Sequence, residues 1–109
     1  MEFAVGVAEV TRRLPTDRVG THVARQLIRC GTAPGANYAE ALGAESRKDF
    51  VHKLKVGLKE LRESLYWLRF GRHLKPAGAI DLGPLIAECD QLIAIFVASI
   101  KTATRNNTS

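Results

Sequence analysis

The 109-residue sequence has little cysteine and no alternating run of β-branched residues bounded by turns, so strands are not expected. Its two cysteines, Cys30 and Cys89, lie far apart, and the lack of a C-x-x-C pair argues against a zinc or redox site. Each cysteine falls in an apolar helical pattern. We therefore expect two buried free thiols in a reducing compartment.

Targeting and membrane signals are also missing. The chain begins with the acidic Glu2 and becomes basic at Arg12 and Arg13, the reverse of a signal peptide. No uninterrupted apolar run approaches the roughly 20 residues that a membrane span needs. The sequence therefore predicts a cytoplasmic protein with no membrane association.

The composition is that of one soluble globular domain, with 46% apolar and 25% charged residues. Lys and Arg number 16 against 11 Asp and Glu, which gives a net charge of +5. Such a charge favours a polyanionic partner, nucleic acid first, unless it serves only solubility.

Proline and glycine divide the chain into four predicted helices. They span residues 2–13, 17–43, 46–73 and 83–105. Short loops make neighbouring helices antiparallel, so the predicted fold is all-α, an antiparallel up-and-down four-helix bundle. Residues 1–105 form this single domain, and 106–109 are predicted to be a disordered tail.

The third predicted helix has an unbroken heptad seam, which indicates one buried stripe. Its members are Val51, Leu54, Leu58, Leu61, Leu65 and Leu68. The second helix has a shorter pattern, Val19, Val23, Leu27 and Cys30. Farther on, Pro34 should kink this helix, with Gly31 and Gly35 easing the kink.

The junction between these helices carries orderly polar residues. Ser46 and Asp49 have capping-box spacing at the start of the third helix. Asn37 and Glu40 are i, i+3 neighbours on the second helix. They either bond the backbone groups that Pro34 frees, which is the favoured alternative, or contact a partner.

Two lines of residues, one along the second helix and one along the third, contain only side chains that can donate hydrogen bonds and no acidic residue. The line on the third helix is Lys48, His52, Lys55, Lys59, Arg62, Tyr66, Arg69 and His73; that on the second is Arg18, His22, Arg25 and Arg29. Cations with an interleaved tyrosine suit a phosphate backbone. The alternatives are a solvated face, or cations that pair with acids on neighbouring helices. Glu60 and Glu63 lie on another flank of the third helix, where they would neutralise a symmetry mate. The predicted nucleic-acid contacts are Arg18, Arg25, Arg29, Lys48, Lys55, Lys59, Arg62 and Arg69.

Another flank of the third helix carries Val56, Trp67 and Phe70. Three large apolar residues on a helix back indicate a contact surface, and we expect an oligomer interface there. Gly57 and Ser64, one heptad apart, would let another helix approach closely.

No enzyme is evident. His22, His52 and His73 stand alone, without H-E-x-x-H spacing or paired Glu-x-x-His motifs. We expect no catalytic residues, metal or cofactor.

The stretch from Ala33 to Leu68 carries a small-residue turn, Ala36-Asn37, Glu40, Ser46, Asp49-Phe50 and Lys53. With these residues the chain, over 14–100, resembles the S23 or intervening-sequence proteins, some of which are encoded in insertions within bacterial large-subunit ribosomal RNA genes. The resemblance implies an antiparallel bundle that assembles as a ring-like homopentamer. It also implies kinship with a basic pentameric accessory protein of diversity-generating retroelements, which engages a reverse transcriptase and nucleic acid.

Two functions follow. The first is a homo-oligomer that binds RNA or DNA through the basic lines, with little sequence specificity. The alternative is a scaffold that docks a partner enzyme such as a reverse transcriptase without touching nucleic acid, with Trp67 or Phe70 as the anchor.

Overall fold

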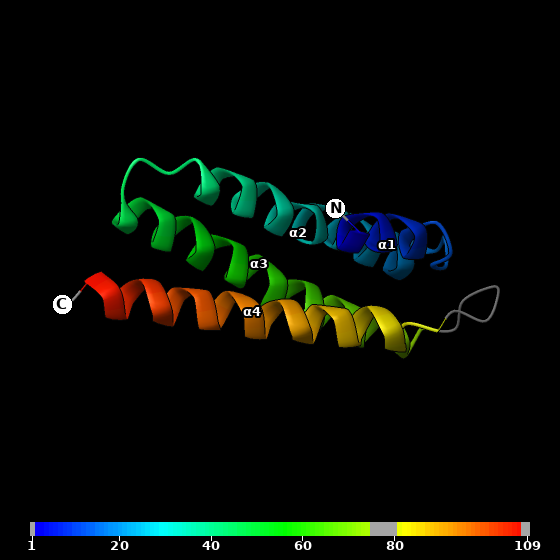
Figure 1. The fold of residues 1–109 in the computed structure, drawn as a ribbon. Helices are drawn as coiled ribbons and strands as arrows, with labels where there is room; N and C mark the ends of the chain where they lie inside the picture. The colour runs from blue at the N-terminus through cyan, green and yellow to red at the C-terminus, as the bar shows by residue number, and fades with distance from the viewer. Residues whose placement is uncertain (1, 75–80, 108–109) are drawn as a thin grey trace.

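A computed structural model of the protein describes residues 2–74 and 81–107, the last two by their backbone alone. Over these residues the chain forms four helices and no strand: α1 (Glu2–Thr11), α2 (Arg18–Leu42), α3 (Arg47–Arg72) and α4 (Gly83–Asn107). Consecutive long helices run in opposite directions, and α1 lies beside the first half of α2 (Figure 1). The predicted all-α, antiparallel four-helix bundle is confirmed.

Polar side chains and a glycine define the helix ends, among them the Ser46 cap predicted from the sequence. Asp17 caps α2 by accepting a 2.8 Å hydrogen bond from Gly20 N, and Ser46 caps α3 by accepting one of 3.0 Å from Asp49 N. Gly43 closes α2. All helix bounds agree with the prediction to within two residues.

The C-terminal end of the chain differs from the prediction. α4 continues to Asn107, two residues into the predicted tail, and 108–109 lie outside the described residues. Residues 75–80 also lie outside the described residues, and they make up most of the loop predicted between the third and fourth helices.

α3 is the central helix and packs against both α2 and α4. Leu54, Leu61 and Leu68 of the predicted seam are completely buried. The other half of the seam, Val51, Leu58 and Leu65, is only partly buried. The buried stripe is completed instead by the small residues Gly57, Ser64 and Gly71.

Small residues occupy the stripe because two helices approach it at once. A Cβ on Gly57 would lie 2.7 Å from Phe96 of α4 and 3.3 Å from the Cβ of Asn37 of α2. Ser64 is buried, and its hydroxyl donates a 2.8 Å hydrogen bond to Glu60 O, so its polar group is satisfied. The close approach expected at Gly57 therefore occurs within one chain.

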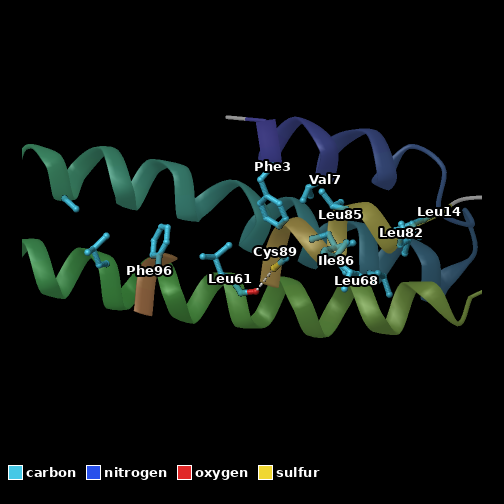
Figure 2. Close-up of a cluster of buried hydrophobic side chains, with 14 residues drawn as sticks. Phe3, Val7, Leu14, Leu61, Leu68, Leu82, Leu85, Ile86, Cys89 and Phe96 are labelled. Atoms are coloured by element: carbon cyan, nitrogen blue, oxygen red, sulfur yellow. Dashed lines mark hydrogen bonds between the residues drawn. The ribbon is translucent and has the colours of Figure 1, made fainter. Parts of the chain in front are cut away.

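The core draws side chains from all four helices and from the loops beside them (Figure 2). Its members include Phe3, Val7, Leu14, Val23, Leu27, Leu61, Leu68, Leu85, Ile86 and Phe96. Cys30 and Cys89 are buried free thiols, as predicted, and Cys89 Sγ donates a 3.3 Å hydrogen bond to Leu61 O.

α2 departs from the prediction at its start. Val19 is exposed, because the first turn points Gly20 inward instead, where a Cβ would lie 1.9 Å from Pro15 O. Farther on, the helix is continuous through Pro34. Gly31 serves packing: a Cβ there would lie 2.8 Å from both methyl groups of Val7 on α1.

Gly31→Ala and Gly35→Ala form a matched pair on the same helix. We expect Gly31→Ala to lower the free energy of unfolding by about 1–3 kcal/mol, because the buried, β-branched Val7 cannot yield easily. Gly35 has open space around its Cβ position, so Gly35→Ala should raise that free energy by about 0.5–1 kcal/mol. Urea titration monitored by helical circular dichroism measures both. Equal effects of the two substitutions would contradict close α1–α2 packing.

Burial raises the pKa of Cys30 and raises that of Cys89 to about 12. The unfolded chain therefore loses its thiol protons first, and this contribution to stability is complete below about pH 8.5 and falls as the pH rises toward 12. At pH 9 we expect iodoacetamide to alkylate both thiols rapidly in guanidinium and far more slowly in the folded protein. Native alkylation of Cys89 at the unfolded rate, read by mass spectrometry, would contradict this burial.

Candidate nucleic-acid interface

The basic line on α3 faces away from the core along its whole length. Burial of the leucine and small-residue stripe directs the opposite side of the helix outward. Every member of the line is exposed: Lys48, His52, Lys55, Lys59, Arg62, Tyr66, Arg69 and His73. At 1.5 Å per residue, the line extends over about 37 Å.

The Lys and Arg side chains of this line are also free of ion pairs within the part of the chain that the structure describes. Within the described residues, none of Lys48, Lys55, Lys59, Arg62 and Arg69 forms an ion pair. Their positive charges can therefore reach an anionic partner without first breaking a contact inside the protein.

The line on α2 is exposed as well, but its last member is engaged. Arg29 pairs with Glu63 and, at 3.4 Å, with Glu60, both on α3. The hydrogen bond to Glu63 raises the pKa of Arg29 above its ordinary value. Intrachain pairing, one alternative considered above, thus holds for Arg29. Arg18 and Arg25 form no ion pair in the part of the chain that the structure describes.

Aromatic contacts join the two lines. The ring of His22 on α2 lies edge-on to Trp67 of α3, with 5.5 Å between centroids, and Trp67 lies 5.0 Å from the ring of Tyr66. Trp67 Nε1 also donates a 3.4 Å hydrogen bond to Glu63. Through Trp67, these contacts bring His22 of the α2 line near Tyr66 of the α3 line. We call the exposed surface of the two helices that carries both lines the α2–α3 face.

The predicted interface residues are not equally accessible. Val56 and Trp67 are half-buried, and Trp67 packs against the core, whereas Phe70 is 39% exposed. Their role in an oligomer stays a prediction.

The junction residues divide into two groups. Ser46 caps α3, as described above, through its hydroxyl and the backbone N–H of Asp49, whereas the Asp49 carboxylate makes no hydrogen bond within the described residues. Asn37 and Glu40 make no side-chain hydrogen bond within residues 2–74 and 81–105, so the favoured idea that they bond the backbone near Pro34 is not met. Asn37 lies instead on the side of α2 next to Gly57.

A largely apolar hollow of about 430 Å³ lies between α2 and α4, beside the first residues of α1. It is lined by residues that include Phe3, Pro34, Tyr38, Leu92, Ile95 and Phe96. Sequence reasoning missed this feature. The short first helix could have indicated it. The ten residues of α1 extend over about 15 Å, too little to cover partner helices that are about 37 Å long.

α4 is more apolar than its uninterrupted runs suggested. Gly83–Arg105 has a mean hydropathy of 1.5 and could cross a membrane by length and composition alone, a criterion that core helices of soluble proteins also meet. Only 22% of the apolar 18-residue stretch within this segment is buried in the bundle. Its outer side carries Ala94, Ile95 and Ala98, all exposed. A single chain therefore leaves an apolar helix face uncovered.

The sequence match decides the family. Residues 1–98 match the family described as 23S rRNA-intervening sequence protein. The chain belongs to this family. It is also similar to a crystal structure of a protein of unknown function from the S23 ribosomal protein family of Bacteroides thetaiotaomicron. The two are 30% identical with a TM-score of 0.79, over 92% of this chain and 93% of that one. No curated protein matches.

Neither the 23S rRNA-intervening sequence family nor this S23 neighbour is described by an enzymatic activity. In the described part of the chain, no three His, Cys, Asp or Glu side chains gather as metal ligands. The candidate site is a charged and aromatic surface.

Proposed function

We propose that this S23-family protein is a non-enzymatic, cytoplasmic homo-oligomer that binds the phosphate backbone of RNA or DNA through its α2–α3 face. The observation that carries the proposal is the basic line on α3, which is exposed throughout and has cations free of intrachain ion pairs. Arg18 and Arg25 of α2 extend it, whereas Arg29 contributes less because Glu60 and Glu63 hold it.

Contacts to phosphates would give the protein affinity for nucleic acid without recognition of the base sequence. Lys and Arg side chains neutralise phosphates and release counterions, whatever the bases are. The family description, 23S rRNA-intervening sequence protein, is consistent with RNA as the partner. Repetition of the α3 line around an oligomer would strengthen each weak contact through avidity.

The oligomer is proposed to form through α4. α4 leaves the apolar residues Ala94, Ile95 and Ala98 exposed between the polar Asp90 and Lys101, and uncovered apolar helix surface favours association. Alanines permit close helix approach, and Ile95 contributes apolar area to bury. The pentameric ring is the assembly that the family resemblance implies. The predicted contact at Val56, Trp67 and Phe70 is the alternative candidate surface.

A partner-enzyme scaffold is the second candidate. The apolar hollow beside Tyr38 and Ile95 favours it, because a protein segment could occupy such a space. None of the described residues that line the hollow is cationic, which separates this candidate from the phosphate-binding face.

Charge reversal tests the nucleic-acid proposal. Fluorescence anisotropy with labelled RNA and DNA would compare the wild type with Lys55→Glu/Lys59→Glu/Arg62→Glu from about 50 to 200 mM salt. We expect affinity to fall at least about tenfold, and the slope of log K against log salt to become shallower by about 2–3, because three phosphate contacts are lost.

A matched control is Arg12→Glu/Arg13→Glu/Lys101→Glu. Each reversal changes the charge by two, so both variants carry −1 instead of +5. The control residues are exposed and lie outside the two lines, so this variant should bind nearly as well as wild type at the higher salt concentrations. Equal losses would show a net-charge effect only. No binding by wild-type protein would overturn the proposal in favour of the scaffold.

Ile95→Glu tests the assembly surface. Ile95 is 55% exposed on α4 and Val5 is 54% exposed on α1, so Val5→Glu is its control. We expect Ile95→Glu to lower the mass in solution by burying an unpaired charge at the contact, while Val5→Glu leaves it unchanged. Light scattering after gel filtration gives the mass. An unchanged oligomer in Ile95→Glu would return the assignment to Val56, Trp67 and Phe70.

A further inference from the structure

A second hollow, of about 280 Å³, lies on the outer side of α3 near the C-terminal end of its basic line. It is lined by Arg62, Leu65, Tyr66, Arg69, Phe70 and His73. The two rings are among the most exposed aromatic groups described: Tyr66 is 59% and Phe70 39% exposed. Their centroids are 6.4 Å apart and their planes are tilted by 31° to each other, so the two rings form one exposed apolar patch.

The ring surface is supported from behind. Trp67 lies edge-on to both rings, with centroids 5.0 Å from Tyr66 and 5.7 Å from Phe70. Trp67 is itself held by its hydrogen bond to Glu63 and by packing against the core. Tyr66 and Phe70 therefore rest on a fixed base, and little ordering is needed when a ligand stacks on them.

Cations surround the rings. Arg62 precedes Tyr66 by one helical turn, Arg69 follows it by three residues, and His73 follows Phe70 by three. Both arginines are without an ion-pair partner in the described chain. The closest acid in sequence, Glu63, is engaged by Arg29 and Trp67. The surface thus combines accessible aromatic faces with positive charge that is not neutralised. Proteins bind single-stranded nucleic acid with this combination.

We infer that Tyr66 and Phe70 stack an unpaired base of single-stranded RNA or DNA while Arg62 and Arg69 contact the phosphates beside it. The inference rests on the proposed function and makes it more specific. Bases of a duplex already stack on one another, so only an unpaired base presents a free face. Since every base has a π-face, this contact selects single strands without selecting sequence.

The test separates bases from phosphates. Its probes are fluorescein-labelled 12-mers of deoxythymidine and of abasic deoxyribose, which carry the same phosphates. We expect the wild type to bind the thymidine probe roughly 5- to 100-fold more tightly than the abasic one. Tyr66→Ala should remove most of this preference and leave abasic affinity and its salt dependence unchanged, because no charge is altered.

Two variants serve as controls. Tyr66→Phe keeps the ring and should keep the preference. Tyr38→Ala removes the only other tyrosine, which is also exposed but lies on α2 beside Phe96, and should have no effect. Trp67 is the single tryptophan, so its emission gives a second readout: the thymidine probe should quench it and the abasic probe should not.

The possible failures are distinguishable. Equal affinity of the wild type for the two probes would contradict the stacking inference but leave the proposal of phosphate binding standing. No wild-type affinity for either probe would overturn both proposals. If Tyr66→Ala instead lowers the mass in solution and weakens both probes equally, the ring surface is a subunit contact and the inference is wrong.

Discussion

The packing of α3 between α2 and α4 is the constraint on which the rest of the structure depends. One helix can face two partners at short range only if its buried stripe alternates leucine with small residues, as Leu54, Gly57 and Leu61 do. Burial of that stripe determines the rotation of α3. Once the rotation is set, the cations seven residues apart have only the outer side available to them.

The same packing explains the character of the charged face. α2 lies close enough to α3 for Arg29 to reach Glu60 and Glu63, and for His22 to touch Trp67. Glu60 and Glu63 of α3 are thus paired within the chain, on the side next to α2. What remains on the outer side is positive and aromatic, which is why binding of phosphates and of exposed bases can be proposed from one helix face.

The short α1 has the opposite consequence. It covers α2 and α4 over part of their length and leaves an apolar hollow and the outer side of α4 without a partner inside the chain. Uncovered apolar helix surface favours association. The bundle accordingly separates two chemistries, with polar binding on the α2–α3 face and apolar association on α4.

The sequence by itself determined four helices, their ends and their antiparallel order, because proline, glycine and capping side chains act over a few residues. It also determined which α3 residues face outward, since a heptad fixes one side of a helix. Only the tertiary structure decided that Arg29 is paired, that Val19 is exposed and that Asn37 lies beside Gly57. Those outcomes depend on the distance and rotation between helices, which packing sets and helical periodicity leaves open.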